Sequence, residues 1–165
     1  MNLLAAFKKV NKEHPDWSLH LVGSYAEDDY YNEIKIFIEK NKLENHVFIY
    51  GSCADVYHVL TQSTIGVLSS KSEGLPVALL EYGLAKLPVV ATYVGDCGLV
   101  ISNKDTGILV EPENHQSLAE ALISYINDLD LRQQFAENFQ NKVKASFSES
   151  SSIEALMNLY KKHQR

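Results

Sequence analysis

The sequence is poor in the residue patterns that mark secreted and metal-binding proteins. It contains 2 cysteines, Cys53 and Cys97, without a Cys-x-x-Cys spacing, and its 6 histidines show no spacing such as His-x-x-x-His. These absences argue against a disulfide framework and against a metal site. No signal-peptide pattern opens the chain, and no Asn-x-Ser/Thr sequon occurs in it. We therefore expect a cytoplasmic setting and no metal cofactor.

Long apolar runs and an excess of positive charge are also missing. The longest uncharged stretch, residues 56–70, is broken by polar residues such as His58 and Thr61, whereas a membrane span needs about 20 apolar residues. Lys and Arg number 15 against 21 Asp and Glu, a formal net charge of −6. An acidic chain has no general attraction for phosphate backbones, so nucleic-acid binding is disfavoured. A length of 165 residues with 45% hydrophobic composition suits one globular domain.

Short apolar runs alternate with segments of helical spacing. The runs predict strands at residues 19–22, 47–50, 64–68, 88–91 and 107–110. Their near-continuous apolar character is typical of strands covered on both faces. Apolar residues at i, i+3 and i+4 predict amphipathic helices between the strands and one helix that ends near His14. A helical tail follows, and its last segment is built on Ile153, Leu156, Met157 and Tyr160. This alternation predicts an α/β fold with a doubly wound parallel sheet.

The turn of residues 69–76, Ser-Ser-Lys-Ser-Glu-Gly-Leu-Pro, is the richest candidate site. Ligands of open α/β sheets bind outside the carboxyl ends of the strands, and this turn follows a predicted strand. We expect Pro76 at the first position of the next helix, where its missing N–H costs nothing. The free amides of that first turn and the helix dipole provide a local anion site. Gly74 would let the backbone approach a ligand closely.

A second carboxylate, Glu81, follows on the same predicted helix. We expect it at the edge of an apolar stripe, where its carboxylate would be partly desolvated and would need donors. The stripe consists of Val77, Leu80, Leu84 and Leu87. Helical side chains lean toward the helix N-terminus, so Glu81 would face the same pocket as Glu73. Two carboxylates at one pocket suit a ligand rich in hydroxyl donors, such as a sugar or a ribose.

The run of residues 72–92, SEGLPVALLEYGLAKLPVVAT, resembles the hallmark of a large family, the retaining nucleotide-sugar glycosyltransferases of the GT-B fold called glycosyl transferases group 1. The shared features are two glutamates separated by seven residues, a small-residue turn and a Pro-Val strand. Further matches, at residues 21–23, 47–51, 107–110 and 147–148, extend the resemblance over nearly the whole chain.

The resemblance implies that residues 1–165 form a single nucleotide-sugar-binding domain, the Rossmann-like, donor-binding carboxyl-terminal half of a hexosyltransferase of polysaccharide biosynthesis. Its amino-terminal acceptor domain would be missing. In this interpretation Glu73 is catalytic and faces the donor sugar and the leaving phosphate. The backbone at Gly74 and Leu75 contacts sugar and phosphate, and Glu81 accepts hydrogen bonds from the ribose hydroxyls.

The resemblance also implies that Gly23 approaches the diphosphate and that the turn at Gly51 and Ser52 borders the base. The family's leaving-group clamp includes an Arg and a Lys ahead of the first helix, a region that we expect to be missing here. The chain has two arginines, Arg132 and Arg165, and both lie in the helical tail. We therefore expect one unfilled position in the sheet, weak donor binding and negligible transferase activity in the isolated chain.

Several alternatives remain open. The chain could be a non-catalytic nucleotide-binding module, or part of a GT-B-fold epimerase or phosphorylase. Lys71 could hold a phosphate or be a solvated loop lysine. The Asp-x-Asp sequence at residues 128–130 falls between two tail helices and indicates helix capping, and Asp28 would likewise open a helix. For a relative with a lipid acceptor, the full-length enzyme would be expected to associate peripherally with a membrane.

Overall fold

Parallel strands alternate with helices, as the sequence predicts. The computed structural model describes residues 1–26, 28–101 and 105–147. Its elements, in chain order, are α1 (Asn2–Glu13), β1 (Leu19–Val22), α2 (Asp29–Lys40), β2 (Val47–Tyr50), α3 (Val56–Thr61), β3 (Gly66–Leu68), α4 (Val77–Leu84), β4 (Val89–Thr92), α5 (Cys97–Val100), β5 (Ile108–Val110), α6 (His115–Asn127) and α7 (Leu129–Ser146). The predicted helix around Ile153 lies outside the described residues.

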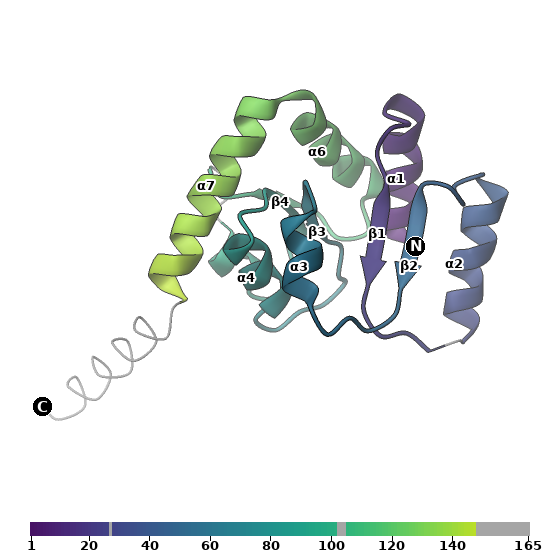
Figure 1. Cartoon of the computed structure of the whole chain (residues 1–165), viewed down its shortest axis with the longest axis horizontal. Helices are drawn as coiled ribbons and strands as arrows, with labels where there is room; N and C mark the ends of the chain where they lie inside the picture. The colour runs from purple at the N-terminus through teal and green to yellow at the C-terminus, as the bar shows by residue number, and fades with distance from the viewer. Residues whose placement is uncertain (27, 102–104, 148–165) are drawn as a thin grey trace, which may run out of the picture.

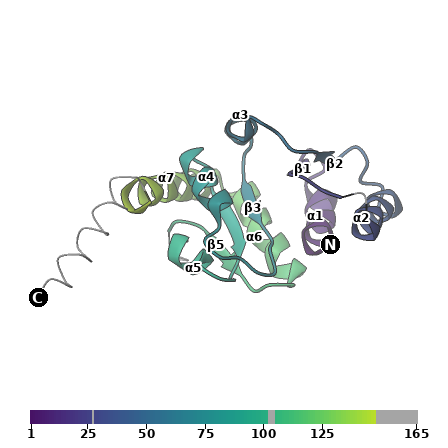
Figure 2. The same cartoon turned by 90° about the horizontal axis from the view of Figure 1, so that it is seen from below.

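The strands form two parallel sheets, a three-stranded one in the order β3-β4-β5 and a two-stranded one of β1 and β2. The parallel α/β architecture is confirmed, and β1 and β2 have the predicted bounds. In Figures 1 and 2, β1 of the smaller sheet lies next to β3 of the larger one. No ladder joins these two strands among the described residues. The array of strands is therefore interrupted between β1 and β3.

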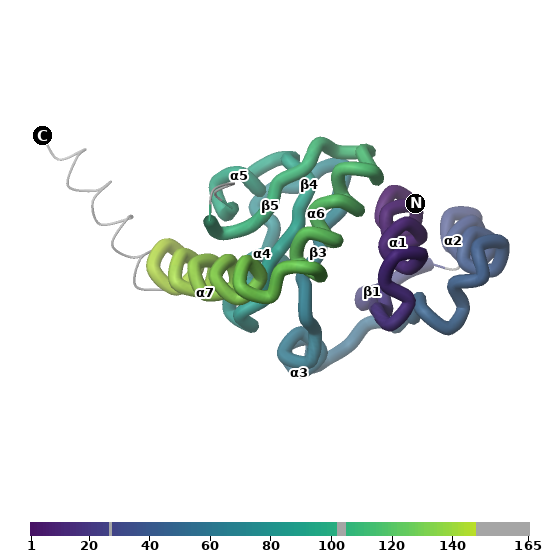
Figure 3. The backbone as a smooth tube through the Cα atoms, turned by 90° about the horizontal axis from the view of Figure 1, so that it is seen from above, coloured from purple at the N-terminus to yellow at the C-terminus, as the bar shows by residue number. Residues whose placement is uncertain are grey.

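One core lies beneath both sheets, and a second core covers only the three-stranded sheet. The first core joins α1 and α6, which lie side by side in Figure 3, to the inner residues of all the strands. The second packs α4, α5 and α7 against the opposite face of β3, β4 and β5. As a result Val89, Val90, Ala91 and Thr92 of β4 are all buried, Val90 with 0% of its surface exposed.

The smaller sheet is covered on one face only, which corrects the expectation that every strand is covered on both. Burial alternates along β1 and along β2, so that His20 and Val22 are exposed in β1, and Phe48 and Tyr50 in β2. On this open face the His20 ring stacks against Phe48 and Tyr50, with ring centroids 5.2 and 5.7 Å apart. His20 and Tyr50 each carry a polar group that remains accessible to water at this face.

Side-chain caps fix the starts of several helices. Asp28, Asp55, Asn114 and Asp128 each accept a hydrogen bond from the backbone N–H three residues later. This confirms the interpretation of Asp28 and Asp128 as capping residues, since a cap satisfies an amide that the helix leaves free. Helix α4 has no side-chain cap. Among the described helices, none combines the length and the apolar character needed to span a bilayer.

Candidate functional site

The turn of residues 69–76 leaves the carboxyl end of β3 and is held in place by the end of β4. The Thr92 hydroxyl, which is fully buried, donates to the Ser70 carbonyl over 2.6 Å. The backbone N–H of Asp96 donates to the Gly74 carbonyl over 3.2 Å. The turn after β3 is therefore bonded at two points, to the last residue of β4 and to the turn that follows β4.

Gly95 allows these two turns to meet. Its φ is +49°, and a Cβ atom at this position would overlap the carbonyl oxygen of Glu73. A residue with a side chain would carry a conformational cost there and would push the Glu73 backbone away. Gly95 thus sets the position of the turn that carries Glu73.

Glu73 is half-buried and oriented by its own turn. The Ser70 hydroxyl donates to Oε1 of Glu73 over 2.6 Å. Behind the turn lies Cys97, whose thiol has a pKa raised first by burial and further by the negative charge of Glu73. The carboxylate is therefore held beside a buried group on one side while the glutamate remains partly accessible to water on the other.

The start of α4, a few residues after Glu73, has no side-chain cap. Pro76 is the N-cap residue, with φ −77° and ψ 97°, so the helix begins at Val77, one residue later than predicted. A proline cap has no side-chain acceptor for the first amides of the helix. Gly74 and Leu75 are exposed, and a Cβ atom at Gly74 would meet no atom within 4 Å. The helix start that the prediction assigned to an anion therefore has no side-chain cap, and anion binding there stays a prediction.

The prediction for Glu81 was wrong in one respect, because Glu81 is exposed and not partly desolvated. The inward face of α4 carries Leu79 and Gly83, whereas Val77 and Leu84 are 61% and 47% exposed. Gly83 faces α7, which packs so closely there that a Cβ atom would collide with the side chain of Val143. A stripe drawn through apolar side chains misses a helix face whose contact depends on a glycine.

The predicted residues of the smaller sheet lie at the carboxyl ends of β1 and β2. Gly23 donates its N–H to the Gly51 carbonyl over 3.4 Å, and its φ of +149° explains why glycine stands there. Gly51 and Ser52 are exposed, and a Cβ atom at Gly51 would meet nothing within 4 Å. Beyond this turn the Tyr25 and Tyr31 rings stack with centroids 4.5 Å apart, a pair that the sequence analysis did not single out.

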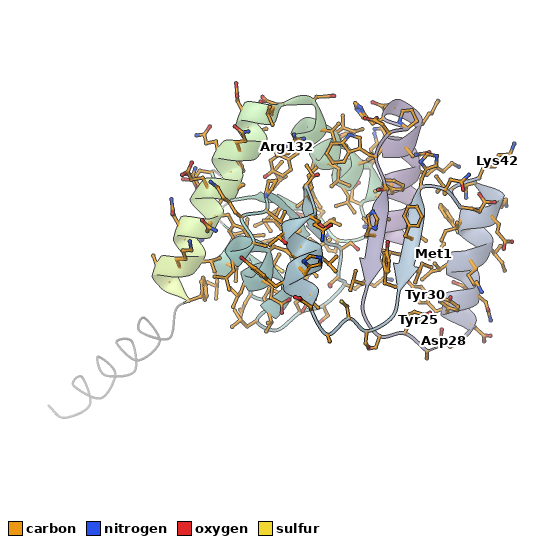
Figure 4. All side chains as sticks on the ribbon, viewed as in Figure 1. Met1, Tyr25, Asp28, Tyr30, Lys42 and Arg132 are labelled. Carbon is orange, nitrogen blue, oxygen red and sulfur yellow. The ribbon has the colours of Figure 1, made fainter. Side chains whose placement is uncertain are left out.

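Lys71 forms an ion pair that joins two turns of the larger sheet. Its Nζ lies 2.5 Å from Oε1 of Glu113, in the turn after β5, and both side chains are exposed. Glu113 raises the pKa of Lys71, and Lys71 lowers the pKa of Glu113. Tyr30 contributes a little to the raised pKa of Lys71, and the Tyr30 hydroxyl accepts a hydrogen bond from the Met1 ammonium over 2.7 Å. Figure 4 shows Met1 and Tyr30 close together. The turns after β3 and β5 thus approach the start of α2.

Arginine is absent from this end of the described chain. Arg132 lies well away from Tyr25 and Asp28 in Figure 4, where it donates to the Tyr125 carbonyl over 3.2 Å and lies over the Trp17 ring. The other arginine, Arg165, falls outside the described residues. Nowhere in residues 1–26, 28–101 and 105–147 do three His, Cys, Asp or Glu side chains gather as metal ligands would. Metal-independent chemistry stays a prediction.

Comparison with known proteins agrees with this architecture. The family model described as glycosyl transferases group 1 matches residues 1–142. The poly(glycerol-phosphate) α-glucosyltransferase of Bacillus subtilis is 31% identical over 139 residues, which cover 83% of this chain and 20% of the relative. The first curated relatives are also much longer, and the matched region spans 34–41% of their length.

Solved structures share the fold. The carboxyl-terminal domain of a glycosyl transferase group 1 family protein from Francisella tularensis is 26% identical, with a TM-score of 0.83 over 90% of this chain and 78% of that one. The Anabaena protein HepE in complex with UDP and glucose is 24% identical, with a TM-score of 0.89 over 97% of this chain and 44% of that one. The fold is the Rossmann-like α/β fold of GT-B glycosyltransferases.

Proposed function

Because the chain belongs to the glycosyl transferases group 1 family, we propose that it is the donor-binding domain of a retaining glycosyltransferase. This enzyme would move a sugar from a nucleoside-diphosphate sugar to a glycan, lipid or other acceptor. The observation that carries the proposal is the turn of residues 69–76, where a held carboxylate and an uncapped helix terminus stand side by side. A sugar offers hydroxyl donors to the first, and a diphosphate offers negative charge to the second.

Glu73 and the start of α4, both at the larger sheet, would bind different parts of the donor. The Glu73 carboxylate is oriented by Ser70 and would accept hydrogen bonds from the donor sugar. The free amides that follow Pro76 would receive the diphosphate, whose developing charge is the main thing that glycosyl transfer must stabilise. A group held in place before the ligand arrives costs little reorganisation during the reaction.

Glu81 would bind the ribose. It lies four residues into α4, about 6 Å along the helix axis from Val77. Its carboxylate is exposed, and no hydrogen bond or ion pair within the described residues occupies it. Gly23, Gly51 and Ser52, at the ends of β1 and β2, would border the diphosphate and the base. A complex of the structurally similar Anabaena protein with UDP supports a nucleotide at such a fold.

We expect the donor-binding domain to work together with a second domain and without a metal. An amino-terminal acceptor domain would supply the second wall of the site, and the relatives are long enough to contain one. Transfer would need no metal, and a cytoplasmic location agrees with two cysteines that form no disulfide. With Lys71 already paired and no described arginine nearby, the isolated chain would bind its donor weakly.

Titration of the chain with UDP, GDP and their sugar conjugates, followed by amide NMR, tests the proposal. We expect shifts in the amides of residues 70–77, and a Glu73→Gln variant with about tenfold weaker binding of the sugar nucleotide but nearly unchanged binding of free UDP. Glu137→Gln is the matched control, because Glu137 is an exposed acid on α7. If millimolar ligand leaves residues 70–77 unperturbed, the site assignment is wrong.

Assays of the longer protein and of its Glu73→Gln variant distinguish a transferase from the alternative functions. Glu73→Gln should abolish acceptor-dependent sugar transfer if Glu73 serves a transferase. In the longer protein with Glu73 intact, interconversion of the donor without an acceptor would indicate an epimerase, and release of sugar to inorganic phosphate would indicate a phosphorylase. Normal cellular function of the variant would favour a non-catalytic binding module.

A further inference from the structure

Two stacked tyrosines lie at the carboxyl end of β1. Tyr25 comes shortly after that strand, and Tyr31 belongs to the first turn of α2. Their rings are nearly parallel, with an interplanar angle of 9° and centroids 4.5 Å apart. Figure 4 shows Tyr25 at the end of the molecule where β1 and β2 finish in Figure 1. The pair therefore stands at the edge of the sheet where ligands of open α/β folds bind.

Tyr31 is the supported member of the pair. Its backbone N–H donates to Oδ1 of Asp28 over 2.9 Å, which fixes the first turn of α2. One turn later on the same helix, Nζ of Lys35 lies 5.1 Å from the centroid of the Tyr31 ring, within the range of a cation–π contact. Tyr31 is also half-buried. The ring that backs Tyr25 is thus held in place by its own helix.

Tyr25 is the exposed member of the pair. It keeps 46% of its surface exposed although it stacks on Tyr31. A further planar ring can stack on an aromatic side chain in the offset, parallel arrangement that these two rings already show. A side chain that is held before binding loses less conformational freedom when the ligand arrives. Tyr25 therefore offers a backed surface for a flat group.

The charges around Tyr25 favour a neutral ligand group over a phosphate. Asp28 and Asp29, three and four residues later in the chain, are both exposed, and carboxylates repel an anion at short range. The nearby cation of Lys35 lies over the Tyr31 ring. A nucleobase is flat and uncharged, and every base has a π face that can stack on an aromatic ring. A sugar ring is neutral as well but is not flat.

The position of Tyr25 relative to the two adjoining turns also suits a base. The Gly23 N–H donates to the Gly51 carbonyl over 3.4 Å, so the turns after β1 and β2 meet there. Tyr25 follows Gly23 by two residues, which places their Cα atoms at most about 7 Å apart. One ribose separates a base from its diphosphate. A nucleotide with its diphosphate near Gly23 can therefore bring its base to Tyr25.

We propose that Tyr25 stacks on the nucleobase of the donor, so that the base becomes the third ring of a column with Tyr25 and Tyr31. This inference rests on the proposed function, because it needs a nucleotide at the ends of β1 and β2. The stack contacts the π face of the base and not its hydrogen-bonding edges, so it strengthens binding without choosing strongly among bases.

Titration of the 165-residue chain with UDP, GDP and inorganic pyrophosphate, followed by NMR, tests the stack. Tyr25→Leu keeps an apolar side chain and removes the π face. It should weaken binding of both nucleotides at least about fivefold and leave pyrophosphate binding unchanged. Tyr25→Phe keeps the ring and should bind like the native chain. Tyr30→Leu is the matched control, because Tyr30 is a 53% exposed tyrosine in the first turn of α2. Melting temperatures verify that each variant is folded.

Nuclear Overhauser contacts between the base protons of UDP and the Tyr25 ring give a direct readout, and we expect to observe them. Shifts at residues 70–77 with equal UDP affinity in the native and Tyr25→Leu proteins would overturn the stack and leave the proposed function standing. Base contacts to Tyr25 with residues 70–77 unperturbed would support the stack and contradict the site at Glu73. UDP that perturbs neither region would contradict both proposals.

Discussion

The two sheets of this molecule are built from similar-looking strands and have different surroundings. The three-stranded sheet has helices on both faces, so that every residue of β4 is buried. The two-stranded sheet has helices on one face, and every second residue of β1 and β2 is exposed. Burial on both faces makes the larger sheet the rigid support of the fold, since rigidity follows from the number of packed neighbours.

The turns at the ends of the two sheets differ in the same way. The turn after β3 is bonded to its neighbour through Thr92 and Asp96 and is fitted against Gly95. The turn after β1 is joined to its neighbour by the 3.4 Å hydrogen bond from Gly23 to Gly51. The carboxylate proposed for chemistry therefore stands on the fixed support, and the residues proposed to border the base stand on the less constrained one.

The largest expected effect comes from truncating one large apolar side chain at each sheet. Leu79→Ala on α4 should lower the free energy of unfolding by about 3 kcal/mol, because Leu79 is 0% exposed and its loss leaves a cavity. Phe48→Ala on β2 should cost about 1 kcal/mol, since Phe48 is 38% exposed. Urea denaturation followed by two probes measures both values. Equal losses would mean that the outer face of β1 and β2 is covered in solution.

A smaller effect is expected from adding a methyl group to a glycine in each turn. Gly95→Ala should destabilise the chain by about 1–2 kcal/mol, because of its φ of +49° and its overlap with the Glu73 carbonyl. The Gly95→Ala protein should also bind sugar nucleotides more weakly, because the new methyl group displaces Glu73. Gly51→Ala is the matched control for stability alone, because the new methyl group meets no atom within 4 Å but Gly51 is proposed to border the base. Thermal denaturation and UDP-sugar titration check both variants. Unchanged binding by the Gly95→Ala protein would mean that Glu73 does not contact the ligand.

The sequence predicts the α/β class and most strand positions because these depend on local pattern. Residues 19–22 and 47–50 are short apolar runs between polar segments, and the structure gives them the same bounds. The one-sided cover of these strands depends on which helices lie nearby. A signal was nevertheless present, because His20 and Tyr50 place polar groups at alternate positions.

Within the candidate site, the local motif was more informative than side-chain periodicity. The motif correctly indicates a turn with Glu73 beside a helix start, since proline and glycine punctuate the chain there. The exposure of Glu81 could not be read from the stripe, because Gly83 has no side chain to mark the face that packs on α7. The pairing of Lys71 with Glu113 joins residues 42 positions apart and requires the fold.

The smallest expected effect concerns this ion pair, which gives the larger sheet a charged rim where the smaller sheet has the stacked Tyr25 and Tyr31. Glu113→Gln should leave the melting temperature almost unchanged, because both side chains are exposed and such pairs contribute little. It should free Lys71 and tighten UDP binding about two- to threefold at low ionic strength, with a smaller gain at high salt. Glu111→Gln, an exposed acid close by, removes the same charge without freeing Lys71.

The pH dependence of that gain gives the sharper measurement. Lys71 lowers the pKa of Glu113, so the pair is intact above the ordinary carboxyl range and is lost as the pH falls through the lowered value. Below that point a protonated Glu113 is neutral, as glutamine is, and the two proteins should bind UDP equally. Calorimetric titrations at neutral and acidic pH, with Glu111→Gln beside them to cancel the titration of the nucleotide itself, measure the difference. A gain that persists unchanged in acid would mean that Glu113 does not act through Lys71, and that the cation at the end of the larger sheet is free before the ligand arrives.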